Sequence, residues 1–139
     1  MKLCQKKHSF ATSGRGFIEI TAELQNAVAD SGIQIGLCHC YIHHTSASLV
    51  ITENADSDVL SDLNNFMNRL VVDGDPCYLH RAEGADDMSA HIRSVLTQTE
   101  ITIPIVKGHL DLGIWQGIYL WEHRAHQHLR TLTQTIQGN

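Results

Sequence analysis

The segment from Ile33 to His43 constrains the fold more than any other part of the chain. Its apolar residues occupy both odd and even positions, and side chains alternate between the two faces of a strand. The apolar members are Ile35, Leu37, Cys38, Cys40, Tyr41 and Ile42. A strand that is apolar on both faces is typical of the middle of a sheet with protein on either side. The sequence therefore predicts a buried central strand over residues 33–43.

Short strands and a helix surround this segment. Residues 3–10 and 16–20 read as two strands joined by a turn, because apolar runs there are separated by Gly and Ser. A helix is expected to follow over residues 21–31, with Thr21 as its N-cap. After a polar corner at His44-Thr45-Ser46, residues 47–52 predict a further strand.

The middle of the chain contains the clearest helical periodicity. Apolar residues recur at helical spacing over residues 59–70 with polar residues between them, and Asp56 is the expected N-cap. The turn sequence at 73–76 ends that helix. A long polar stretch then leads to a short helix over residues 88–96.

The last third of the chain is predicted to form strands. Residues 101–106 and 110–115 are expected to be two strands that flank a tight turn. Residues 117–121 either continue the second strand or bend away from it at Gly117. Residues 129–136 alternate between apolar and polar, which predicts a half-exposed strand. The order is then ββα, ββα and three or more strands. This order predicts one α+β domain over residues 1–139, dominated by antiparallel sheet.

Charge and cysteine content exclude several classes of function. The formal net charge is −5 and no basic run exceeds Lys6-Lys7, so no nucleic-acid partner is expected. No apolar run reaches signal-peptide or membrane-spanning length, so we expect a cytoplasmic protein without a membrane partner. The four cysteines form no CxxC pair and are expected to be free. Cys38-His39-Cys40 cannot easily place three ligands on one side of a strand.

Two groups of polar residues lie at predicted strand ends. At the corner between two apolar strands, His44 offers an imidazole nitrogen to a metal or substrate, and Thr45 and Ser46 offer hydroxyl groups. The alternative is a hydrogen-bonded turn in which histidine caps exposed backbone. Near the C-terminus, Arg124 can present a planar fork to a phosphate. The alternative there is a charged exit from a strand.

A third polar group lies around the start of the short helix. Asp87 and His91 are four residues apart and project from one face of that helix, while His80 lies on the preceding loop. Two histidines with nearby carboxylates suit zinc or a similar divalent ion, and Asp86 with Asp87 also suits magnesium. The alternative is ordinary capping of the helix by the two aspartates.

These groups fall within motifs that resemble, in the same order, the motifs of the YjbQ-like family, often described as secondary thiamine-phosphate synthases. The resemblance extends over roughly residues 5 to 138. Ser89, Gln98 and Ile114 stand where the family commonly has proline, glycine and threonine. The matching motifs are His44–Leu49, Glu53-Asn54, Glu83–Met88 with His91-Ile92, Ile103–Ile105, Leu112-Gly113 with Trp115–Gly117, and Glu122–Arg124.

The resemblance implies two packed, mainly antiparallel sheets with flanking helices, assembled as a homotrimer. It also implies a pocket near the subunit boundary in which His44, His80 and His91 hold a divalent metal, zinc or magnesium. Asp87, one helical turn before His91, is expected to orient that imidazole. The late aromatic residues Trp115, Tyr119 and Trp121 are expected to mark a buried subunit surface.

The resemblance further implies a reaction that joins hydroxymethylpyrimidine diphosphate to thiazole phosphate with release of pyrophosphate. Charge neutralisation by a metal or Arg124 would assist departure of the diphosphate. The alternatives are a non-catalytic protein that binds metal or small anions, and a metal-dependent hydrolase. The expected catalytic residues are His44, Glu53 and Arg124, and the expected residues that bind a phosphorylated substrate are Thr45, Ser46, Asn54, Asp86, Asp87, Gln116 and Arg124.

Overall fold

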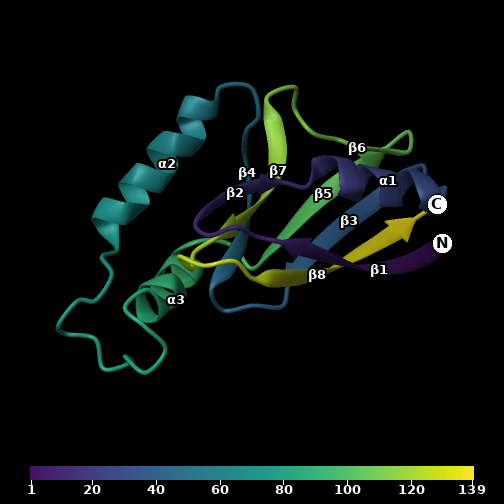
Figure 1. Ribbon diagram of the computed structural model, residues 1–139. Helices are drawn as coiled ribbons and strands as arrows, with labels where there is room; N and C mark the ends of the chain where they lie inside the picture. Colours follow the sequence, from purple (N-terminus) through teal and green to yellow (C-terminus); the bar gives the residue numbers. More distant parts are fainter.

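Two antiparallel sheets form the body of the protein. The computed structural model covers residues 1–139 and contains eight strands and three helices (Figure 1). The larger sheet contains, in spatial order, β1 (Lys2–Ala11), β8 (Leu129–Gly138), β3 (Ile35–Ile42), β5 (Glu100–Val106) and β6 (His109–Leu110). The smaller sheet contains β2 (Gly16–Glu19), β7 (Gln116–Glu122) and β4 (Ala47–Glu53). The predicted α+β class is confirmed.

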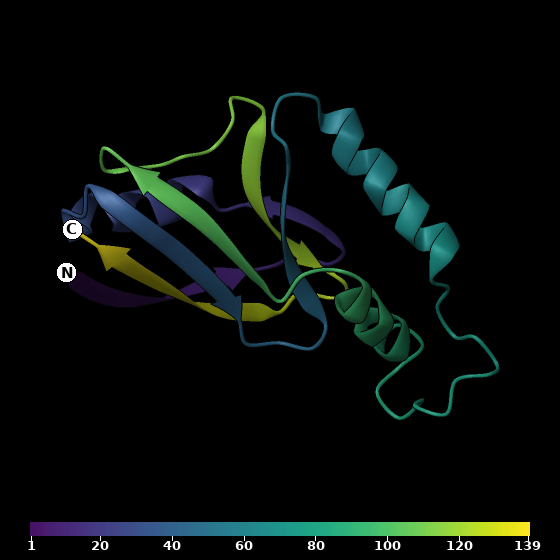
Figure 2. The same cartoon turned by 180° about the vertical axis from the view of Figure 1, so that it is seen from behind.

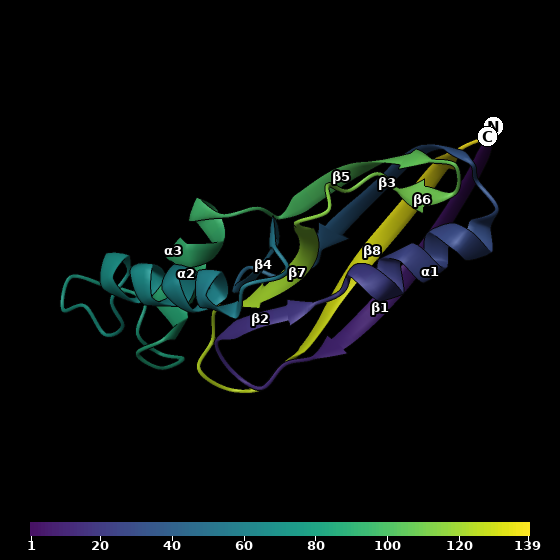
Figure 3. The same ribbon diagram turned by 90° about the horizontal axis from the view of Figure 1, so that it is seen from above.

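The main apolar core is formed by the inner faces of both sheets and by helix α1 (Thr21–Ser31). In β5, Ile101, Ile103 and Ile105 are buried while the residues between them are exposed, because successive side chains of a strand point to opposite faces. Helix α1 lies along the larger sheet and adds Leu24 to this core (Figure 3). Burial of each large aliphatic side chain contributes about 1.5–3 kcal/mol.

Strand β3 lies in the middle of the larger sheet, as predicted, but only one of its faces is buried. Its backbone pairs with β8 on one side and with β5 on the other. On the opposite face from the core, Ile35, Leu37 and Tyr41 are 70%, 42% and 44% exposed. The expectation of burial on both faces is therefore wrong, because no second layer of this chain covers the outer face of the larger sheet.

The four cysteines are free, as the sequence predicts. Cys38 and Cys40 both point from β3 into the core and are fully buried. The hydrogen bond with Cys38 and burial both raise the pKa of the Cys40 thiol. A thiol in this setting behaves as a small apolar side chain.

Helices α2 (Ser57–Leu70) and α3 (Asp87–Leu96) lie at the end of the molecule opposite the two termini (Figures 1 and 2). The predicted N-cap of α2 is confirmed, because the Asp56 carboxylate accepts a hydrogen bond from the backbone N–H of Asp58. Helix α3 packs against β4. None of the three helices combines the length and apolar character that crossing a bilayer requires.

Two local predictions are wrong. Thr21 is the first residue of α1 and not its cap, because its hydroxyl accepts from the backbone N–H of Ile118 and donates to Glu19. The strand expected over residues 110–115 ends at Leu110. A turn follows in which the backbone N–H of Gly113 donates to the side chain of Gln116.

Candidate metal centre

The start of α3 is held in place by an arginine from the end of β7. Asp86 precedes the helix, but its side chain makes no capping bond. Its carboxylate instead accepts hydrogen bonds from Nε of Arg124 at 2.9 Å and from the backbone N–H of Ala125 at 2.8 Å. Burial opposes ionisation of Asp86, but these bonds outweigh it and lower its pKa to about 2. The carboxylate is therefore a fixed anion.

Asp87 is the centre of a compact group of ligating side chains. Its side chain is almost fully buried, and Oδ1 accepts from Nη1 of Arg124 at 2.7 Å. Oδ2 lies 2.5 Å from Nε2 of His80 and 3.3 Å from Nε2 of His91. One ligand atom from each of His80, Asp87 and His91 lies within 4.8 Å of the others. Burial works to raise the pKa of Asp87, but His80, His91 and Arg124 lower it.

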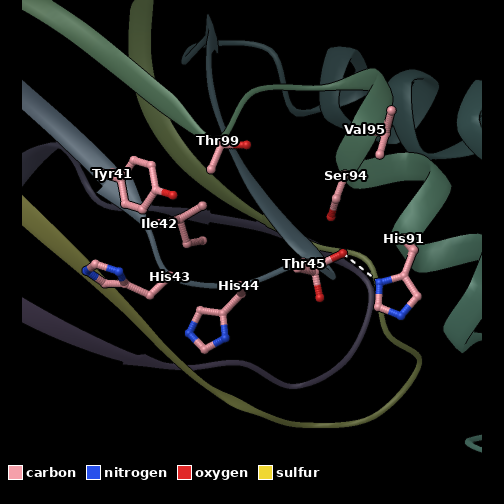
Figure 4. Close-up of a pocket in the computed structure, with 9 residues that line it drawn as sticks. All are labelled: Tyr41, Ile42, His43, His44, Thr45, His91, Ser94, Val95 and Thr99. Atoms are coloured by element: carbon pink, nitrogen blue, oxygen red, sulfur yellow. Dashed lines mark hydrogen bonds between the residues drawn. The ribbon is translucent and has the colours of Figure 1, made fainter.

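The tautomer of His91 shows what this group lacks. Nδ1 of His91 lies 2.9 Å from the backbone oxygen of Thr45, which can only accept, so Nδ1 carries a hydrogen (Figure 4). In the neutral ring, Nε2 then presents a lone pair to the Asp87 carboxylate. Two acceptors at 3.3 Å repel each other unless a proton or a metal ion lies between them. Metal-binding histidines commonly donate their second nitrogen to such a carbonyl.

His44 lies near this group without joining it. Its Nε2 accepts a hydrogen bond from the backbone N–H of Thr131 at 2.8 Å. Burial above all, and then the charge of Arg130, lower the pKa of His44. The neutral ring therefore carries its hydrogen on Nδ1 and is a donor there. Of the predicted set, the structure brings His80 and His91 together, with Asp87 as the third member of the group, while His44 lies outside it.

His44 and His91 line a cavity of about 490 Å³ beside the candidate centre (Figure 4). Its walls combine apolar groups with imidazole and hydroxyl groups. Ser94 and Val95 follow His91 by three and four residues, so helical spacing alone could have indicated them. The carbonyl of Thr45 has no sequence signal, because every residue has one. The remaining lining residues are Tyr41, Ile42, His43, Thr45 and Thr99.

Arg124 and Ser46 are engaged within the protein. The Arg124 guanidinium donates to Asp86, to Asp87 and to the backbone oxygen of Glu83. It orients the two carboxylates, and its role as a phosphate ligand stays a prediction. The Ser46 hydroxyl accepts from Nη2 of Arg130 at 2.9 Å, next to a buried ion pair with Glu122.

The predicted catalytic residue Glu53 and the predicted substrate residues Asn54 and Gln116 lie at the far end of the smaller sheet. In the pairing of β4 with β7, Ala47 faces Glu122 at one end, and Glu53 faces Gln116 at the other. Six residues of strand separate the ends by roughly 20 Å. The Asn54 amide donates to the backbone oxygens of Ile114 and Gln116. Within one chain, Glu53, Asn54 and Gln116 therefore do not meet the candidate metal centre.

Comparisons of sequence and of structure with known proteins match the same family over nearly the whole chain. The family model described as UPF0047 protein YjbQ-like matches residues 6–139. A UPF0047 protein of Synechocystis is 49% identical over 128 residues, which cover 92% of this chain and 87% of that protein. The UPF0047 protein YjbQ of Escherichia coli O157:H7 is 43% identical over 135 residues, covering 96% and 97%. A YjbQ/UPF0047 family crystal structure from Clostridium acetobutylicum has a TM-score of 0.87 at 34% identity, covering 95% and 99%.

Proposed function

Since the chain belongs to the YjbQ-like UPF0047 family, we propose that it is an enzyme that acts on a phosphorylated small molecule at a divalent metal held by His80, Asp87 and His91. The observation that carries this proposal is that Nε2 of His91 lies 3.3 Å from Oδ2 of Asp87 while its Nδ1 faces the backbone oxygen of Thr45. A divalent cation between them satisfies both groups. Two imidazoles and one carboxylate favour zinc over magnesium, which prefers oxygen ligands and water.

The residues around the proposed metal can each be given a role. Three protein ligands leave an open position on a tetrahedral metal, which a substrate oxygen can occupy. Arg124 fixes the rotamer of Asp87 from the side away from the histidines. The Nδ1–H of His44 and the hydroxyl of Thr45 line the adjacent cavity and supply donors for phosphate oxygens. A bound metal would neutralise the charge of a departing diphosphate.

We further propose secondary thiamine-phosphate synthase activity, which rests on the family resemblance. Elemental analysis of purified protein is the first test, and about one zinc per chain is the expected result. Pyrophosphate release is then measured with hydroxymethylpyrimidine diphosphate and thiazole phosphate, separately and together. Release that requires both substrates supports the synthase. Phosphate release from a single substrate would indicate the hydrolase, and metal without turnover a binding protein.

The assembly is also a proposal: a cytoplasmic homotrimer, as the resemblance implies. Of the three aromatic residues expected at a subunit surface, Tyr119 and Trp121 are buried within the chain. Trp115 remains 61% exposed. The exposed apolar face of β3 offers further surface for a subunit contact. Light scattering at micromolar concentration that gives a 15.5 kDa particle would contradict the trimer.

A further inference from the structure

Arg93 is a buried cation without a charged partner. It lies on α3 and is 3% exposed. Its Nη2 donates to the backbone oxygen of Val71 at 2.9 Å, while its buried Nε has no hydrogen-bond partner. A buried charge without a counter-charge is costly, and buried unpaired polar atoms are rare in native proteins. The position of Arg93 therefore calls for a functional reason.

The nearest acidic side chain is already neutralised by a different arginine. Nη1 and Nη2 of Arg15 donate to the two carboxylate oxygens of Asp73 at 2.7 and 2.6 Å. The hydroxyl of Ser89 donates to the same carboxylate. Two guanidinium groups and one carboxylate leave a net charge of about +1 in this region. Burial first, and then the charge of Arg15, lower the pKa of Arg93, while the Asp73 carboxylate opposes this shift.

Arg93 lines a hollow of about 420 Å³ between the end of α2 and α3. Val71 and Val72 form its apolar wall, and Asn68 places an amide at its edge. Ser89 and Arg93 follow Asp87 and His91 by two residues each, and two residues turn a helix by about 200°. The hollow therefore lies on the opposite side of α3 from the candidate metal centre, and none of its lining residues belongs to that centre.

We propose that this hollow is a second binding site, which takes a small oxyanion, a carboxylate or phosphate group, against the guanidinium of Arg93. One negative charge balances the net charge of the region, and a planar fork of N–H donors matches the oxygens of such a group. The bidentate pair with Arg15 keeps the Asp73 carboxylate from repelling the anion at full strength. This site does not depend on the proposed enzyme activity.

The test is a titration of the whole protein with sodium phosphate and, separately, sodium acetate, at constant ionic strength and with a metal chelator present. The nitrogen–proton NMR signal of the Arg93 Nε–H group is followed, together with the thermal midpoint. We expect a saturable shift of that signal and a higher midpoint with at least one of the two anions. A response to one alone identifies the group that is recognised.

Variants decide whether the response belongs to this site. The Arg93 variants lack the Nε–H signal, so their binding is measured by the shift of the thermal midpoint with anion concentration. Arg93→Met should weaken binding at least about tenfold, since hydrogen bonds to a charged group are lost. Arg69→Met, which removes an exposed arginine on α2, and His91→Ala, which alters the metal centre, should bind as the parent does. If Arg93→Met does not fold, Arg93→Lys keeps the charge without the fork and should still weaken binding. No saturable shift relative to chloride, or equal binding by a folded Arg93 variant, would overturn the proposal.

Discussion

The two sides of α3 differ in the charge that they lack: one side has room for a cation, and the other has a buried cation without an anion. On one side, the Asp87 carboxylate faces two imidazoles, and the tautomer of His91 leaves room for a cation. On the other side, the Arg93 guanidinium is buried without a carboxylate. Asp87 and Arg93 are both almost completely buried, and both lie on the same ten-residue helix. The same short element thus presents a site for a cation and a site for an anion.

The difference lies in how each buried charge is compensated. Asp87 has Arg124 at 2.7 Å as a counter-charge before any ligand binds, although the same guanidinium also pairs with Asp86. Arg93 has only a backbone carbonyl, since the neighbouring Asp73 is paired with Arg15. Removing Asp87 breaks one of the two ion pairs of Arg124 and leaves Asp86 as its remaining carboxylate partner, whereas removing Arg93 breaks no ion pair.

The largest effect is expected from Asp87→Asn. The change removes the more deeply buried of the two carboxylates that pair with Arg124, which is also one of three proposed metal ligands. Breaking a buried ion pair from one side costs about 3–5 kcal/mol, and we expect urea unfolding to show a loss at the lower end of that range because asparagine can still accept one bond. Bound zinc should be lost as well. Asp62→Asn on α2 is the matched control. Unchanged stability would contradict the compensation argument.

Loss of His91 should affect the metal more than the fold. His91→Ala removes a partly exposed ring, so unfolding free energy should change by less than about 1 kcal/mol. Zinc affinity, measured by competition with a chelator, should fall more than about 100-fold, since a direct ligand is lost. His44→Ala should leave the affinity nearly unchanged, because His44 lies outside the ligand group. Equal losses in both variants would restore the three-histidine set that the sequence suggested.

His44 shows how far sequence reasoning reaches at this site. The spacing of Asp87 and His91 correctly placed both on one helical face, and His80 on the preceding loop folds back as expected. The engagement of His44 by the backbone of Thr131 depends on a contact between residues 87 positions apart. No local pattern encodes such a contact. The same holds for Arg124, whose three partners come from the first residue of α3 and the loop before it.

The fold was easier to predict than the exposure of its faces. Period-two patterns in β5 and β8 and the helical pattern of α2 depend on neighbours in sequence, and the structure confirms them. The apolar residues on the outer face of β3 predicted a second covering layer that this chain does not supply. Hydrophobicity indicates that a surface prefers contact, but it does not say whether the same chain provides that contact.

His123 is expected to make the stability depend on pH, with an effect of intermediate size. It lies near Arg15 and Arg93, and its backbone oxygen accepts a hydrogen bond from Nε of Arg15. The ring is fully buried, and burial first, then the charge of Arg93, lower its pKa to about 3. The unfolded chain has a histidine pKa near about 6.5, so it binds the additional proton between these values. Stability is thus complete above about pH 6.5 and falls as pH decreases, by up to about 1.4 kcal/mol per pH unit. Urea unfolding between pH 4.5 and 7 measures this slope.

The variant His123→Gln tests whether the pH dependence of stability comes from His123. It removes the titrating ring while keeping a side chain that can bond to Ser48. The variant is expected to be less stable, but its unfolding free energy should change less between about pH 4.5 and 7. Ordinary carboxylates titrate mainly below this interval. A slope that persists in the variant would point to other groups, among them His44, whose pKa burial also lowers.

The smallest effect on stability is expected from Arg93→Met, and it separates the two sides of α3 most sharply. Replacing a buried, unpaired guanidinium by an apolar chain of similar length removes a desolvation cost and one hydrogen bond to Val71. These terms oppose each other, so the unfolding free energy should change by less than about 1 kcal/mol. Arg124→Met is the matched comparison and should cost about 3 kcal/mol, since it leaves the Asp86 and Asp87 carboxylates without their partner. The pKa of His123, followed by NMR, should rise in Arg93→Met, because a nearby positive charge is gone. Equal destabilisation by the two substitutions would mean that Arg93 is held by compensation comparable to that of Arg124, and the asymmetry between the two sides would not exist.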